Sequence, residues 1–173
     1  LGEVWEDGTT KIAYSQRRKY LLGRETNGLM NYPFRTALMA YLLGGGAEYF
    51  RDSMEELREN YPAPAFYGAM NFLSTHDTPR LLTILGLTSP WGRENAELVQ
   101  YFQQLGALRK SHEALQSGTI VYHAAQGRAL AFSRRTEHDH CLTAVNAGDE
   151  PVTLTLPWDD TLAENALSPP EFF

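Results

Sequence analysis

The pattern of apolar residues changes near Gly118, and this change constrains the fold more than any other feature of the sequence. Before Gly118, short apolar runs alternate with segments of helical spacing, which is typical of a parallel sheet with helical connections. After it, short β-type runs are separated by turn residues, which indicates an antiparallel meander in a small sandwich. These runs are Thr119–His123, Ala129–Arg134, Cys141–Asn146 and Val152–Leu156. We therefore predict an α/β domain over residues 1–115 and an incomplete all-β domain over residues 116–173.

Helices and strands can be placed within the first domain. Ala47–Glu59 and Asn95–Lys110 carry apolar side chains on one face at helical spacing, so we expect both faces to pack in the core. Gly44-Gly45-Gly46 lacks the Lys-Ser/Thr pair of a phosphate loop and is interpreted as a helix terminator. The extended candidates are Leu1–Trp5, Gly28–Tyr32 and Phe66–Thr75.

Composition excludes several classes of protein. With 43% apolar and 21% charged residues, the chain can build a packed core. Its net charge of −6 argues against a nucleic-acid partner, which usually requires a basic surface. One cysteine, Cys141, cannot form a disulfide within the chain. No apolar run approaches the roughly 20 residues of a membrane-spanning helix, so we expect no membrane partner.

The carboxylate of Glu3 lies at the end of the first predicted strand, two residues before Trp5. An aromatic neighbour disfavours the charged form of a carboxyl group, which suits a general acid. In a parallel α/β barrel, the carboxyl ends of the strands form the rim of the active site. The alternative is an acidic surface loop with Trp5 in the core.

The richest segment is Asn71–Arg80, in which an apolar run ends in polar groups. His76 and Asp77 follow the strand, and Arg80 is expected one turn into the next helix. A histidine and a carboxylate at this position can bind neighbouring hydroxyls of a sugar. Helix capping, with Thr78 as N-cap and a proline after it, is the alternative interpretation of the segment.

Together these segments are similar to the α-amylase family of glycoside hydrolases. Gly2–Trp5 resembles the family's general-acid motif on the fifth barrel strand, and Asn71–Arg80 resembles its seventh-strand motif. Met30–Arg35 and Arg58–Pro62 resemble segments of the neopullulanase and cyclomaltodextrinase branch. Leu108–Gly118 resembles the end of the eighth helix, before the family's C-terminal β-domain. The similarity covers almost the whole chain in the right order.

The resemblance implies a fold and a set of roles. Residues 1–115 would be strands five to seven of a (β/α)8 barrel, with their helices, in a retaining hydrolase of α-1,4 or α-1,6 glucosidic bonds. Glu3 would be the general acid/base, and Asp77 would stabilise the transition state. The substrate, an α-glucan such as maltodextrin or cyclodextrin, would contact further side chains. These are Trp5, Asn31, Tyr32, His76 and Arg80.

Two departures from the family pattern indicate a fragment. The family's nucleophile is an Asp in an Arg-x-Asp segment of the fourth strand, and this sequence has no such segment. Only 27 residues separate Arg80 from Leu108, too few for the eighth strand and its loop. We expect these residues alone to be inactive and to need the N-terminal part of the barrel as a partner. The alternative is a non-catalytic remnant or sugar-binding module, and an oligomer is compatible with either.

No cofactor is expected, and no metal ligand is assigned. His138-Asp139-His140-Cys141 has metal-binding residue types, but no second cluster completes a shell, and a hairpin turn is the simpler interpretation. The sequence begins without Met and without a leader pattern, which is expected of a fragment. We expect the parent protein to be cytoplasmic, although a secretion signal would lie outside this sequence.

Overall fold

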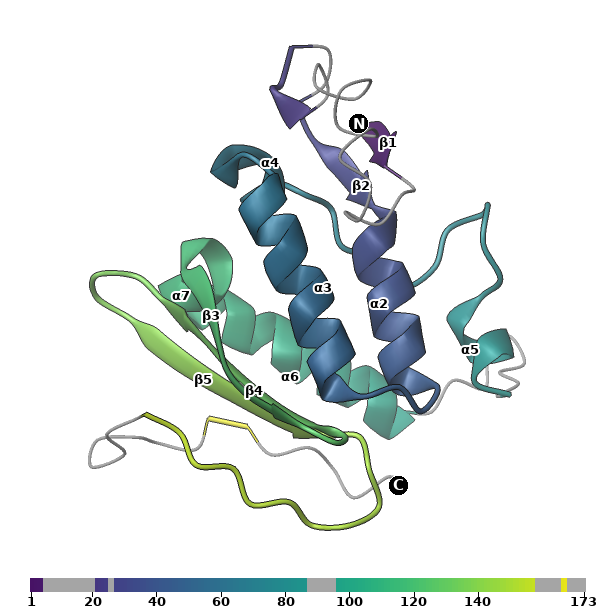
Figure 1. Ribbon diagram of the computed structural model, residues 1–173, viewed down its shortest axis with the longest axis vertical. Coiled ribbons are helices and arrows are strands. Elements are labelled where there is room, and N and C mark those ends of the chain that lie inside the picture. Colours follow the sequence, from purple (N-terminus) through teal and green to yellow (C-terminus); the bar gives the residue numbers. More distant parts are fainter. Residues whose placement is uncertain (5–20, 25–26, 87–95, 158–165, 168–173) are drawn as a thin grey trace.

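The computed structural model describes residues 1–4, 21–24, 27–86, 96–157 and 166–167 (Figure 1). Helices α2 and α3 stand side by side between two small sheets, and α6 lies behind them. No helix in the described ranges is both long enough and apolar enough to cross a bilayer. The elements are β1 (Gly2–Val4), β2 (Leu29–Asn31), α2 (Tyr32–Leu42), α3 (Ala47–Asn60), α4 (Ala63–Tyr67), α5 (Leu81–Ile84), α6 (Ala96–Ser111), α7 (Glu113–Ser117), β3 (Thr119–Gln126), β4 (Ala129–Arg135) and β5 (His140–Asn146).

The first sheet is parallel, as predicted. Strand β1 pairs with β2 in parallel, and Met70 forms a parallel bridge with Met30 on the other side of β2. The prediction of an extended segment over Phe66–Thr75 is wrong at its start, because α4 includes Phe66. The cause is local: Pro62 and Pro64 fix the backbone torsion φ at the beginning of a helical turn.

Helix α3 forms as predicted, and its buried residues belong to the core. Its Phe50, Met54 and Leu57 lie on one buried face. Gly44, with φ of +110°, follows the end of α2, which confirms the interpretation of the triple glycine as a helix terminator.

The second sheet is antiparallel in the order β3–β4–β5. Three of the four predicted strands are confirmed, but Val152–Leu156 is wrong: these residues form no strand. The chain turns after β5 because the Asn146 side chain accepts the N–H of Gly148 and donates to the carbonyl of Glu150. The residues that the structure describes contain one antiparallel layer there, without the second layer of the expected sandwich.

The two parts of the chain share a core. Leu130 of β4 is buried with the apolar face of α3, and Tyr122 and Phe132 pack against the same cluster. The β3–β4 turn contacts the first turn of α3, where Ala47 N–H donates to the Gly127 carbonyl at 2.7 Å and Gly127 N–H donates to Glu48 Oε1 at 3.0 Å. The domain boundary between residues 115 and 116 stays a prediction, and apolar packing continues across it.

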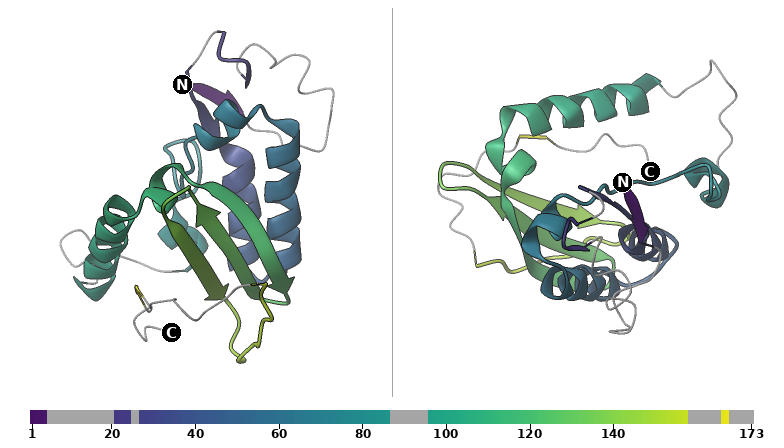
Figure 2. Two further views of the ribbon diagram at one scale, coloured as in Figure 1. Left: turned by 90° about the vertical axis from the view of Figure 1, so that its left-hand side faces the viewer. Right: turned by 90° about the horizontal axis from the view of Figure 1, so that it is seen from above.

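Helix α6 confirms the predicted helix but not its predicted burial. Val99, Phe102 and Leu105 are 44%, 57% and 38% exposed, and no described residue of this helix is buried. Figure 2 shows α6 apart from α2 and α3, joined to the sheet through α7. An amphipathic pattern is sufficient for a helix to form, but burial of its apolar face needs a neighbouring element.

Two leucine substitutions, one in α3 and one in α6, test whether α3 is packed in the core while α6 is exposed. Leu57→Ala should lower the free energy of unfolding by about 2–5 kcal/mol, because Leu57 is 1% exposed and its removal leaves a cavity. Leu105→Ala, also in a helix, should cost less than about 1 kcal/mol. Urea denaturation of both variants measures the difference. Equal losses would contradict the described packing of α6.

Candidate active site

The carboxyl ends of the parallel strands bring several predicted site residues to one edge. Glu3 pairs with Met30 across β1 and β2, and its side chain is exposed. Asn31 ends β2, while Asn71 follows the bridge at Met70. The Asn31 side-chain amide donates to Asn71 Oδ1 at 2.9 Å, which ties these two strand ends together. The edge therefore joins the Glu3 strand to the segment that carries His76 and Asp77.

Asn31 and Tyr32 have structural contacts at this edge. Asn31 is 6% exposed, and its Oδ1 accepts the Phe34 N–H at 3.1 Å, which caps α2. Tyr32 is 2% exposed and packs edge-to-face on Phe72 with ring centroids 4.8 Å apart. Their burial fixes the strand ends, and direct contact of either residue with a substrate stays a prediction.

His76 and Asp77 lie on an exposed turn and face each other. His76 Nε2 is 3.3 Å from Asp77 Oδ1. The Asp77 N–H donates to Thr75 Oγ1, and the Thr75 N–H donates to Thr78 Oγ1. These hydrogen bonds order the turn while the imidazole and the carboxylate remain accessible. An accessible pair of this kind can bind two neighbouring sugar hydroxyls.

The short helix α5 begins later than the sequence predicts. Arg80 is its N-cap residue and is exposed, not one turn inside the helix. The Leu81 N–H donates to Ser74 Oγ at 2.8 Å, so Ser74 supplies the cap that was expected of Thr78. The error has a physical reason: a hydroxyl seven residues before a helical N–H has no recognised capping spacing.

Arg35 holds this turn in place, a contact that the sequence did not predict. From α2, its Nε donates to the Leu73 carbonyl at 3.0 Å and its Nη2 donates to the Pro79 carbonyl at 3.1 Å. In the sequence, Leu73 precedes and Pro79 follows the pair formed by His76 and Asp77. Arg35 falls within the Met30–Arg35 segment, but nothing in the sequence indicates that it bonds backbone atoms about 40 residues away.

The rest of the predicted site is incomplete. Trp5 lies outside the described residues. Glu3 and Asp77 provide two carboxylates of the kind that glycoside cleavage uses, one as acid and one near the sugar ring. The sequence contains no Arg-x-Asp segment to supply a nucleophile.

Comparison with curated proteins gives relatives of one type, although no protein-family model matches the chain. A cyclomaltodextrinase of Geobacillus thermopakistaniensis is 26% identical over 92% of the chain. Neopullulanase 2 of Thermoactinomyces vulgaris is 25% identical over 90% of the chain. The chain spans 33% of the length of each of these relatives.

Solved structures show the same fold. A cyclomaltodextrinase structure superimposes with a TM-score of 0.74 at 24% identity, over 92% of this chain and 33% of that one. A debranching enzyme from Nostoc punctiforme gives a TM-score of 0.71 at 23% identity, over 85% of this chain and 40% of that one.

These matching proteins belong to the α-amylase family of glycoside hydrolases, and the chain is similar to them at low identity over most of its length. The fold is consistent with part of that family's barrel, accompanied by a small antiparallel sheet. Among the curated relatives are cyclomaltodextrinases, a neopullulanase and amylopullulanases, which confirms the resemblance seen in the motifs.

Arg35→Met tests whether the arginine holds the His76–Asp77 turn. Losing two hydrogen bonds from a charged donor should lower the local opening free energy by about 1–3 kcal/mol, and so raise amide exchange in residues 74–78 by roughly fivefold or more. Hydrogen exchange measures this effect. Arg58→Met is the matched control, because Arg58 bonds Glu55 within α3. Unchanged exchange in Arg35→Met would contradict the assignment.

Proposed function

We propose that this chain is part of a retaining hydrolase of α-1,4 or α-1,6 glucosidic bonds in α-glucans, maltodextrins or cyclodextrins. The observation that carries the proposal is the shared strand edge, where β1 brings Glu3 beside β2 and Asn31 is bonded to the segment leading to His76 and Asp77. The names of the curated relatives, cyclomaltodextrinase and neopullulanase, support the same reaction class.

The roles follow from retaining chemistry. Glu3 protonates the glycosidic oxygen of the leaving group and later removes a proton from water. Asp77 accepts hydrogen bonds from sugar hydroxyls and stabilises the oxocarbenium-like transition state. His76 donates to the same sugar. Trp5, Asn31, Tyr32 and Arg80 complete the proposed contacts with the substrate.

The nucleophile belongs to a part of the barrel that this sequence does not contain. We propose that β1, β2 and the Met70 segment correspond to barrel strands five, six and seven, and that residues 116–173 belong to a C-terminal sandwich. The N-terminal part of the barrel, with an Arg-x-Asp segment, is the required partner. The alignment with the Geobacillus relative extends over 204 residues, more than the 173 of this chain, which supports internal shortening of this chain relative to that protein.

A second candidate function is a sugar-binding module without catalysis. The observation that favours it is the exposed His76–Asp77 pair, which can bind sugar hydroxyls without a nucleophile. The two functions differ in turnover and not in sugar recognition, because both use His76 and Asp77 to bind hydroxyls.

Glu3→Gln in the protein that includes the nucleophile segment separates the two. Hydrolysis of maltodextrin should fall by about 10²–10⁴-fold, because the glucose leaving group needs a proton. Hydrolysis of an activated aryl maltoside should fall far less, since its leaving group departs without acid assistance.

Glu137→Gln, at an exposed turn residue, is the matched control and should leave both rates unchanged. Residues 1–173 without the nucleophile segment serve as the negative control. Equal losses on both substrates would show that Glu3 is not the acid. Turnover by the negative control would mean that another carboxylate of this chain is the nucleophile.

A further inference from the structure

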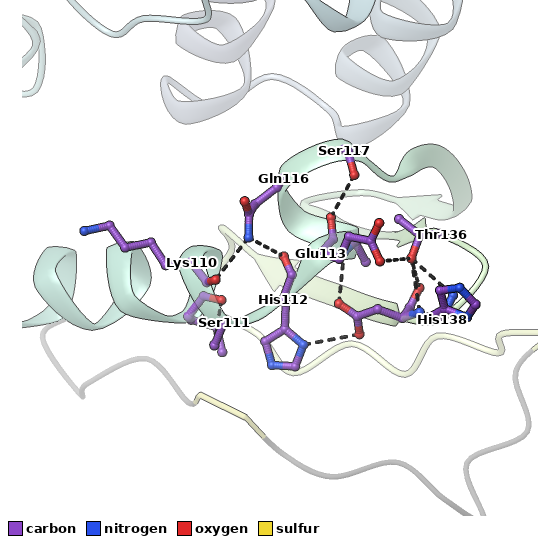
Figure 3. Close-up of polar contacts among 11 residues, drawn as sticks. Lys110, Ser111, His112, Glu113, Gln116, Ser117, Thr136 and His138 are labelled. Atoms are coloured by element: carbon purple, nitrogen blue, oxygen red, sulfur yellow. Dashed lines mark hydrogen bonds and ion pairs between the residues drawn. The ribbon is translucent and has the colours of Figure 1, made fainter.

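A second group of chemically reactive side chains lies away from the strand edge, where α6, α7 and the β4–β5 turn meet. His112 separates the two helices, Asp139 ends the turn, and Cys141 is the second residue of β5. One ligand atom from each of the three residues lies within 4.8 Å of the other two. Figure 3 shows the His112 ring at the helix junction, and its Nδ1 is 3.3 Å from Asp139 Oδ1.

We propose that His112, Asp139 and Cys141 bind a divalent transition-metal ion of the zinc type. The residue types decide the class of ion: imidazole and thiolate suit zinc, whereas calcium and magnesium prefer oxygen ligands. This proposal does not depend on the glycosidase function, because none of the three residues lies at the strand edge.

The spacing of the ligand atoms fits such an ion. Ligand atoms about 2.0–2.1 Å from a tetrahedral zinc are about 3.3 Å apart. That spacing is found between His112 Nδ1 and Asp139 Oδ1. Three atoms no more than 4.8 Å apart lie within about 2.8 Å of a common point, so side-chain movements of less than about 1 Å bring all three to bonding distance. A fourth position is then left for water.

The scaffold around the ligands is already fixed. The second carboxylate oxygen of Asp139 accepts the Ala114 N–H at 2.9 Å, which orients the carboxylate at the start of α7. The Thr136 hydroxyl accepts the Asp139 N–H at 3.1 Å, which holds the turn. The His112 N–H donates to the Leu108 carbonyl, so the backbone of the histidine is held by the end of α6. Outer hydrogen bonds of this kind commonly support metal ligands.

The sequence alone did not indicate this group, because one ligand, His112, is distant in the chain from the other two. The run from His138 to Cys141 contains two of them, but the histidine that joins them comes from 27 residues before Asp139. His138, which the run suggested, lies instead beside Glu137 on the exposed turn. Binding would release the Cys141 thiol proton to solvent and would fasten β5 to the junction of α6 and α7.

Titration of the reduced 173-residue chain with cobalt(II) tests the proposal. We expect one ion per chain, a near-ultraviolet sulfur-to-cobalt charge-transfer band, and displacement of cobalt by zinc. Cys141→Ser should abolish the band, and His112→Gln should weaken the affinity by more than about tenfold. His138→Gln, the matched control, should bind as the unchanged chain does.

Thermal unfolding supplies a second readout. Zinc should raise the melting temperature of the unchanged chain but not that of Cys141→Ser, and calcium should raise neither. Circular dichroism of the metal-free variants establishes that they are folded. Absence of the charge-transfer band in the unchanged chain, or equal zinc stabilisation of Cys141→Ser, would overturn the proposal.

Discussion

Arg128, in the turn between β3 and β4, connects the helical part of the chain to the sheet. Its guanidinium donates to the carbonyls of Leu42, Gly45 and Ala147, which end α2, lead into α3 and follow β5. It lies 5.5 Å from the ring centre of Tyr41, whose hydroxyl donates to the Arg128 carbonyl at 2.7 Å. One side chain thus donates to the carbonyls of three segments that meet around the core, and removing it would remove these hydrogen bonds.

The shared core explains why the sheet and α3 form one packed body. Tyr122 shows the degree of burial: its pKa is raised because the phenolate would lose its hydration in the core. Leu57 and Leu130 are among the least exposed side chains, and they belong to the same cluster from opposite sides of the predicted boundary. The helical layer that positions β2 is therefore stabilised by the sheet, and the strand edge depends indirectly on this packing.

Local patterns predicted several of the elements but not α2, α4 or α7, whereas contacts between distant residues could not be predicted. The helical spacing of apolar residues predicted α3 and α6, and short β-type runs separated by turn residues predicted β3, β4 and β5. The exposure of Phe102 could not follow from periodicity, because burial depends on which element lies opposite. Glu3, His76 and Asp77 came from motifs, and their placement by parallel strands agrees with the expected order. Arg35 and the junction at His112 were missed because their partners are 27 or more residues away.

We propose that the edge formed by the ends of β1, β2 and the Met70 segment recognises an α-glucan. Titration of the isotopically labelled chain with a maltooligosaccharide, followed by amide chemical shifts, tests it directly. We expect shifts concentrated at Glu3, Asn31, Tyr32 and residues 71–80, with β4 and β5 unaffected. Shifts confined to the antiparallel sheet, or no shifts at a saturating sugar concentration, would contradict it.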